Sequence, residues 1–165
     1  MYANKEDALP LKQRSSRRRF IAMDIENING GALMGNESAA VAWREVAEVI
    51  GLSDHEHVVV GVGPSSLLAA GLGCPSARFV LGRGLNGADH ALIEVLRSER
   101  IPNRFDEVVI VSGDGEFSEV AAWLASEGAG VTVVARDGHL SRRLQMAATN
   151  IVLLPNRVEI LGQAA

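Results

Sequence analysis

Three kinds of feature are scarce in this sequence, and each scarcity excludes a class of protein. The 165 residues include one cysteine, Cys74, which excludes an internal disulfide and a metal–thiolate cluster. Aromatic residues make up 4% of the chain and hydrophobic residues 47%, so we expect an aliphatic core. No apolar run approaches the roughly 20 residues of a membrane-spanning helix. These absences favour a cytoplasmic protein without a membrane partner.

Lysine is absent after Lys12, so the rest of the chain carries its positive charge on arginine alone. Residues 1–19 are basic, whereas the whole chain has a net charge of −4. This distribution predicts a flexible basic arm before an acidic body, and it argues against a protein that coats nucleic acid. Receiver domains, haloacid-dehalogenase-type phosphatases and P-loop NTPases each need a lysine beside their acidic site, so its absence excludes them.

From residue 20 onward, short apolar runs alternate with segments of helical periodicity. The expected strands are 20–24, 57–62, 77–81, 107–112, 131–135 and 150–154, and the expected helices are 37–50, 65–71, 86–100, 116–127 and 139–148. Most of the strands are continuously apolar, which is typical of a parallel sheet buried on both faces. We predict one doubly wound α/β domain over residues 20–155, between the arm at 1–19 and a short tail at 156–165.

Acidic residues follow the strands at the edge where such sheets bind ligands. Asp24 ends the first strand, Asp114 follows the fourth, and Asp89 begins the helix that leads to the fourth strand. If the first and fourth strands are neighbours, these carboxylates repel one another unless a proton or a cation lies between them. An all-oxygen cluster suits Mg²⁺ or Mn²⁺. Glu116 adds a fourth carboxylate, and Asn27 offers an amide.

A purely structural interpretation of these residues stays open. Asp114 has the position of a helix N-cap, and Asn86 and Asp89 have the spacing of a capping box. Glu116 can complement a helix dipole. Asp24 fits such an interpretation least, because a charge at the end of a buried apolar strand has no evident structural task.

Other polar features allow two interpretations each. The segment GVGPSS at 61–66 is either a phosphate cradle or a plain turn with a serine cap. Arg136, Arg142 and Arg143 either contact RNA phosphates or, for the last two, form a solvated helix face. The four histidines show no metal-ligand spacing, and we expect them at the surface.

Four segments together resemble the NYN domains, a branch of the PIN-like metal-dependent nucleases. SGDGEF is similar to the family's SGD-x-D-F signature, and FIAMDIENI to its opening strand with D-x-x-N. GLNGADHAL resembles its K-G-x-D helix start, and GAGVTVVARDGHLSRRLQMAATNIVLL its closing strand, helix and strand. The segments occur in the family's order and cover about residues 20–155.

This resemblance implies a three-layer α/β/α sandwich with strand order 3-2-1-4-5. It implies Asp24, Asp89 and Asp114 as catalytic metal ligands, with Glu116 where the family usually has aspartate. We expect substrate contacts from Asn27, Ser112 and Arg83, a list in which Arg83 replaces the basic residue that the family often has at the position of Asn86.

The implied activity is cleavage of RNA, which we expect to be single-stranded, with Mg²⁺ or Mn²⁺ and an activated water. A non-catalytic PIN-like module that binds RNA or a protein partner is the alternative. A homodimer is the expected assembly.

Overall fold

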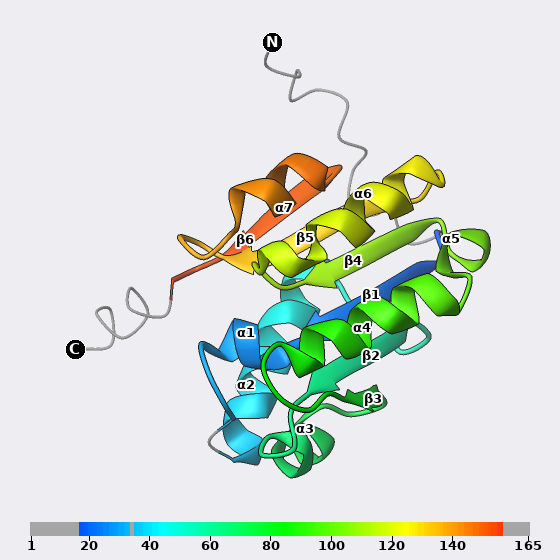
Figure 1. Ribbon diagram of the computed structural model, residues 1–165. Coiled ribbons are helices and arrows are strands. Elements are labelled where there is room, and N and C mark those ends of the chain that lie inside the picture. Colours follow the sequence, from blue (N-terminus) through cyan, green and yellow to red (C-terminus); the bar gives the residue numbers. More distant parts are fainter. Residues whose placement is uncertain (1–16, 34, 157–165) are drawn as a thin grey trace.

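The computed structural model describes residues 17–33 and 35–156, which form one six-stranded sheet with helices on both faces (Figure 1). Its strands are β1 (Arg19–Asp24), β2 (His57–Val62), β3 (Arg78–Leu81), β4 (Glu107–Val111), β5 (Gly130–Arg136) and β6 (Asn150–Leu154). Its helices are α1 (Ile25–Asn29), α2 (Asn36–Ile50), α3 (Leu67–Gly73), α4 (Gly87–Ser98), α5 (Ile101–Arg104), α6 (Ser118–Ser126) and α7 (Arg142–Ala147), with a 3₁₀ turn, η2, at Gly115–Phe117.

The strand order is β3-β2-β1-β4-β5-β6, and every neighbouring pair is parallel. This confirms the predicted order 3-2-1-4-5, with β6 added at one edge. The chain winds from β1 toward β3 and then returns to wind from β4 toward β6. The order therefore reverses between β1 and β4, where Met23 lies beside Val111.

Alternate strand residues feed two separate cores, one on each face of the sheet. One core lies beneath α4, α5, α6 and α7 and includes Ala22, Ile110 and Phe117. The other lies beneath α1, α2 and α3 and includes Met23 and Val60. Figure 1 shows α4, α6 and α7 in front of the sheet and α2 behind it. The predicted three-layer sandwich is confirmed, and the burial of both faces explains why the strands are continuously apolar.

The first strand begins one residue earlier than expected. Arg19 lies in β1, where its Nη1 donates to the carbonyl of Ile50 at 2.9 Å and its Nη2 to that of Gly51 at 3.2 Å. Arg19 therefore belongs to the folded body rather than to the basic arm. The rest of that arm through residue 16 and the tail from residue 157 lie outside the described residues.

None of the described helices has both the length and the apolar character that crossing a bilayer requires.

Candidate metal centre

Asp24 lies at the sheet's carboxyl edge, at the point where the strand order reverses. It ends β1 with 4% of its surface exposed. Its Oδ2 accepts a hydrogen bond from Ser112 Oγ at 3.1 Å, and its Oδ1 accepts from the backbone amide of Asn27 at 3.4 Å. The second bond caps α1. The expectation that Asp24 has no structural task is thus wrong, because it caps a helix too short for periodicity to predict.

Asp89 reaches this edge from the first turn of α4, and its exposure is 6%. Gly61 on β2 lies beside Asp24 in register. A Cβ atom at Gly61 would lie 2.6 Å from Leu92 Cγ and 2.9 Å from the carbonyl oxygen of Ala88. Because Gly61 has no side chain, α4 packs directly on the sheet at this point. That close approach brings Asp89 into hydrogen-bonding contact with Asp24.

Asp114 is the half-buried member of the cluster and lies in the loop after β4. Its Oδ1 accepts from the amide of Glu116 at 3.0 Å, so the predicted helix-capping role is confirmed. Its own amide donates to Ser112 Oγ at 3.2 Å. Asn27 Oδ1 accepts from the amide of Gly113 at 3.0 Å. These bonds join the loop to β1 and α1, so Ser112 and Asn27 fix the position of Asp114.

Burial and mutual repulsion set the ionisation of the three carboxyl groups. Desolvation, followed by the hydrogen bond and the charge of Asp24 and then those of Asp114, raises the pKa of Asp89 to about 9. Burial also raises the pKa of Asp24, and hydrogen bonds from Asp89, Ser112 and the backbone of Asn27 oppose that rise. Asp89 is therefore protonated at neutral pH, and its single O–H donates to one neighbouring carboxylate at a time, with Asp24 the stronger influence.

The described ranges, 17–33 and 35–156, contain no three Asp, Glu, His or Cys side chains arranged around one ion. The hydrogen bonds account for this arrangement, because Asp24 and Asp114 each turn an oxygen to a backbone amide and Asp89 holds a proton. The donor set nevertheless fits a hard divalent cation. It consists of carboxylate oxygens, it is largely buried, and its members repel one another once the proton leaves.

Glu116, predicted as a fourth ligand, lies apart from these three groups. Its side chain is 45% exposed, and its Oε2 lies 3.7 Å from Nε2 of His90. Glu116 is also absent from the groups that shift the pKa of Asp24 or Asp89. Its predicted role as a ligand therefore gains no support from this arrangement.

The residues predicted to contact substrate differ in their surroundings. Ser112 is fully buried and its hydroxyl is bonded on both sides, so it orients the carboxylates instead of meeting a substrate. Asn27 is half-buried, and its amide oxygen is engaged by Gly113. Arg83 is exposed on the loop between β3 and α4. Of these three residues, Arg83 alone is exposed.

Arg136 has a structural role that the sequence did not indicate. It is 3% exposed, its Nε donates to the carbonyl of Ile28 at 2.9 Å, and its guanidinium pairs with Glu45. The proposed contact of Arg136 with RNA phosphate is thus wrong, because the side chain joins α1 to α2. Arg142 and Arg143 are exposed on α7, as a solvated helix face requires. All four histidines are exposed, as predicted.

The phosphate-cradle interpretation of residues 61–66 is not supported. Ser66 is fully buried, and its Oγ accepts from the amide of Leu33 at 3.0 Å. The amide of Gly63 faces Oε1 of Glu26 at 3.4 Å, and a carboxylate at that position disfavours a phosphate.

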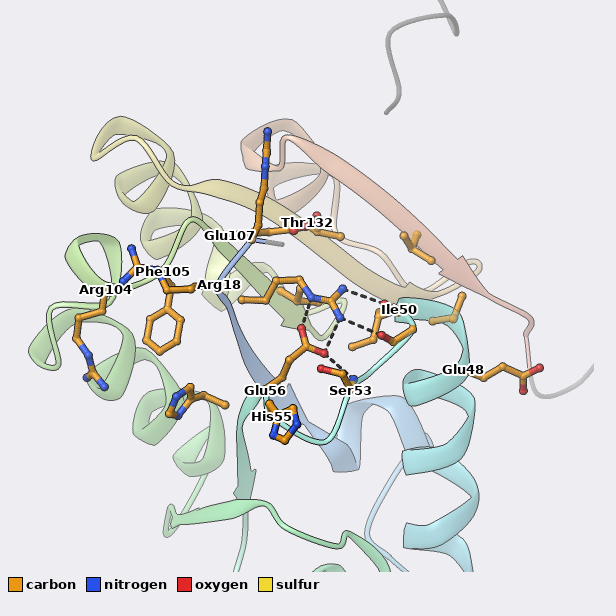
Figure 2. A pocket seen from close by; sticks show the side chains of 17 residues that line it. Arg18, Glu48, Ile50, Ser53, His55, Glu56, Arg104, Phe105, Glu107 and Thr132 are labelled. Atoms are coloured by element: carbon orange, nitrogen blue, oxygen red, sulfur yellow. Dashed lines mark hydrogen bonds and ion pairs between the residues drawn. The ribbon is translucent and has the colours of Figure 1, made fainter. Parts of the chain in front are cut away.

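A cavity of about 690 Å³ opens at the opposite, amino-terminal edge of the sheet (Figure 2). Its lining includes the ion pair of Arg19 with Glu56, and Glu107, which accepts from the hydroxyl of Thr132 at 2.7 Å. It shares no residue with the carboxylate cluster. The cluster and the cavity are therefore separate features of the two edges.

Comparison with known proteins bears on both the family and the fold. Residues 74–155 match the model of the NYN domain family, which confirms the resemblance seen in the motifs. The matched segment includes Asp89 and Asp114, whereas Asp24 joins them from β1. No curated protein matches the chain. A crystal structure of a protein of unknown function from Vibrio parahaemolyticus is similar, with a TM-score of 0.53 and 19% identity over 84% of this chain and 93% of that one. This likeness shows the fold alone.

Proposed function

Starting from a chain whose residues 74–155 match the NYN domain family, we propose that this protein is a Mg²⁺- or Mn²⁺-dependent endoribonuclease. The observation that supports the proposal most is the convergence of Asp24, Asp89 and Asp114 at the edge where the strand order reverses. Two of the three are buried, and all three lie where open α/β sheets bind ligands.

Asp24, Asp89 and Asp114 would hold the cation. When bound, a divalent metal supplies neutralisation of charge on a phosphate oxygen and activation of a water molecule. The chain's own part is to position the carboxylates and to take up a proton in the absence of metal. Ser112 and Asn27 hold the loop of Asp114 against β1, and loss of the Asp89 proton completes the anionic site.

The proposed substrate is single-stranded RNA lying across the carboxyl edge of the sheet. Arg83 on one side and the exposed Arg142 and Arg143 on the other offer charges to its phosphates. The cytoplasm is the compartment expected for such an enzyme.

A second function stands beside this one, because the carboxyl groups are internally satisfied. Asp24 and Asp114 both cap helices, and the Asp89 proton holds the cluster together without a metal. These features favour a non-catalytic module that binds RNA or a protein partner.

Cleavage of a labelled single-stranded RNA with Mg²⁺ or Mn²⁺ separates the two functions. The informative variant is Asp114→Asn, because asparagine keeps the oxygen that caps the Glu116 amide and removes the charge. We expect activity to fall by roughly 100-fold or more, in line with the loss of a group that holds catalytic charge. Asp54→Asn, an exposed carboxylate in the loop before β2, is the matched control and should keep full activity.

Absence of cleavage by every form of the protein would reject the nuclease. RNA binding that persists in that case, unaffected by metal, would establish the binding module.

A further inference from the structure

Helix α3 has an unusual distribution of side chains. Its sequence, LLAAGLG, contains no polar residue. It packs its small side chains against the protein: Ala69 is 9% exposed and Ala70 is fully buried, whereas Leu68 and Leu72 are 75% and 69% exposed. A helix that is apolar on all sides is normally buried on all sides. The outer stripe of Leu68 and Leu72, one helical turn apart, is therefore a surface that the described residues leave uncovered.

The inner face of α3 packs closely against α2 at Gly73. A Cβ atom at Gly73 would lie 2.6 Å from the Cβ of Ala39 and 2.7 Å from the carbonyl oxygen of Asn36. The two helices are thus in contact through their backbones, and α3 has no room to rotate its leucines inward. Their exposure is fixed by the fold.

The apolar surface continues to the edge of the sheet. Strand β3 pairs with β2 on one side, and its other side is an unpaired edge in the described part of the sheet. Leu81 at the end of β3 is 40% exposed. The amide of the next residue, Gly82, donates to the carbonyl of Val62 at 3.0 Å, just before the turn that leads into α3. Helix α3 and the free edge of β3 thus belong to the same flank of the molecule, as Figure 1 shows.

Charge indicates what covers this flank. Residues 57–88 contain no aspartate or glutamate, although the whole chain has 20 such residues and a net charge of −4. Of the two arginines in that segment, Arg78 is bound by Glu99 through hydrogen bonds of 2.9 and 2.6 Å. This segment therefore has almost no charged side chain that could pair with a strongly charged partner. Two copies of this acidic chain, by contrast, meet with little repulsion on this flank.

We infer that the α3–β3 flank, defined by Leu68, Leu72 and the free edge of β3, is the interface of a two-fold symmetric homodimer. Antiparallel pairing of two β3 edges joins the sheets and keeps the same face of each on the same side. The two α3 helices then flank the symmetry axis together, so their leucine stripes cover each other. This assembly is independent of the proposed nuclease activity.

The test is the molar mass of the full chain in solution, measured by light scattering or sedimentation from low to high micromolar concentration. We expect the wild type to have twice the mass of one chain. Leu68→Glu and Leu72→Glu should each raise the dissociation constant by roughly 100-fold or more, because each dimer would bury two unpaired carboxylates. Met146→Glu is the matched control: Met146 is 80% exposed on α7, at the opposite flank, and its variant should remain dimeric.

The experiment also tests whether the variants are folded. Leu68→Lys alone should be monomeric, and mixing it with Leu68→Glu should restore a dimer, which misfolded chains cannot do. A wild type with the mass of one chain throughout overturns the inference, and so does a dimer that neither leucine variant weakens. A monomer that sediments with anionic lipid vesicles in a Leu68-dependent manner would assign the flank to a membrane surface and also overturn it.

Discussion

Asp24 and Asp114 each cap a helical segment, and this cap is compatible with the metal-binding role proposed for them. Each gives one oxygen to a backbone amide, that of Asn27 for Asp24 and that of Glu116 for Asp114. A carboxylate has two oxygens with several acceptor positions between them, so a cap leaves capacity for a cation. The cap also fixes the side-chain rotamer. The observed cap and the proposed metal role therefore do not compete for the same oxygen at these positions.

Asp89 is the residue whose ionisation depends most on folding. Its pKa is raised to about 9 in the folded protein, compared with about 3.9 for an unperturbed aspartate. Between these two values the folded state binds a proton that the unfolded state lacks. Stability of the metal-free protein therefore falls as pH rises from about 4 to about 9. Below that window Asp89 is protonated in both states and contributes nothing to the pH dependence of stability.

Asp89→Asn isolates this contribution, because asparagine keeps a hydrogen-bond donor and cannot ionise. With EDTA present, we expect the denaturation midpoint of the wild type to decrease from pH 5 to pH 9 more steeply than that of the variant. The difference between the two slopes removes the contribution of the histidines and other groups. Parallel slopes would show that Asp89 is ionised in the folded protein and that the shared proton does not exist.

At the level of elements, the site depends on the contact between α4 and β2. Gly61 admits the first turns of α4 to the sheet, and Asp89 projects from the first of those turns. A methyl group added at a tight helix–sheet contact leaves the packing unchanged only where the neighbouring atoms can move aside. Here the neighbours are a core side chain, Leu92, and a backbone carbonyl, that of Ala88.

Gly61→Ala should therefore push α4 outward and separate Asp89 from Asp24. We expect a loss of about 1–3 kcal/mol in the free energy of unfolding, as for other overpacked cores. We also expect weaker Mn²⁺ binding in calorimetry. The matched control is Gly71→Ala on α3, where an added Cβ meets nothing within 4 Å. Equal metal affinity in the two variants would show that the position of α4 does not determine the site.

The elements that could be predicted from sequence are those with a long or repeated pattern. Most of the six strands are continuous apolar runs and the larger helices have a clear apolar period, and all are present with ends within a few residues of the expected ones. Helices α1 and α5 were missed because five and four residues are too few for a helical period. The meeting of Asp24 with Asp114 followed from topology alone. The contact of Asp89 depends on packing at Gly61, and Glu116 lies exposed beside His90; neither placement has a local sequence signal.

At the level of the whole molecule, the fold holds mutually repelling carboxyl groups together at one edge of a sheet whose two faces carry well-packed cores. The cluster lies at the carboxyl edge, at the point where the strand order reverses, and Arg136 joins the nearby α1 to α2. Burying acidic groups destabilises the protein when no cation is present. Any ion that binds the folded state and not the unfolded state offsets that cost.

Mn²⁺ should accordingly raise the melting temperature of the wild type. At 100 times its dissociation constant a ligand stabilises by about 2.7 kcal/mol, which corresponds to roughly 5–10 °C for a domain of this size. Asp24→Asn should raise the melting temperature of the metal-free protein, because it removes a buried charge. Its one carbonyl oxygen can still accept from the Asn27 amide, and its amide nitrogen can donate to Ser112 Oγ. The same variant should abolish the Mn²⁺ shift, whereas Asp54→Asn should keep it. If Asp24→Asn destabilises the metal-free protein and leaves the Mn²⁺ shift intact, Asp24 is a structural residue and the ion binds elsewhere.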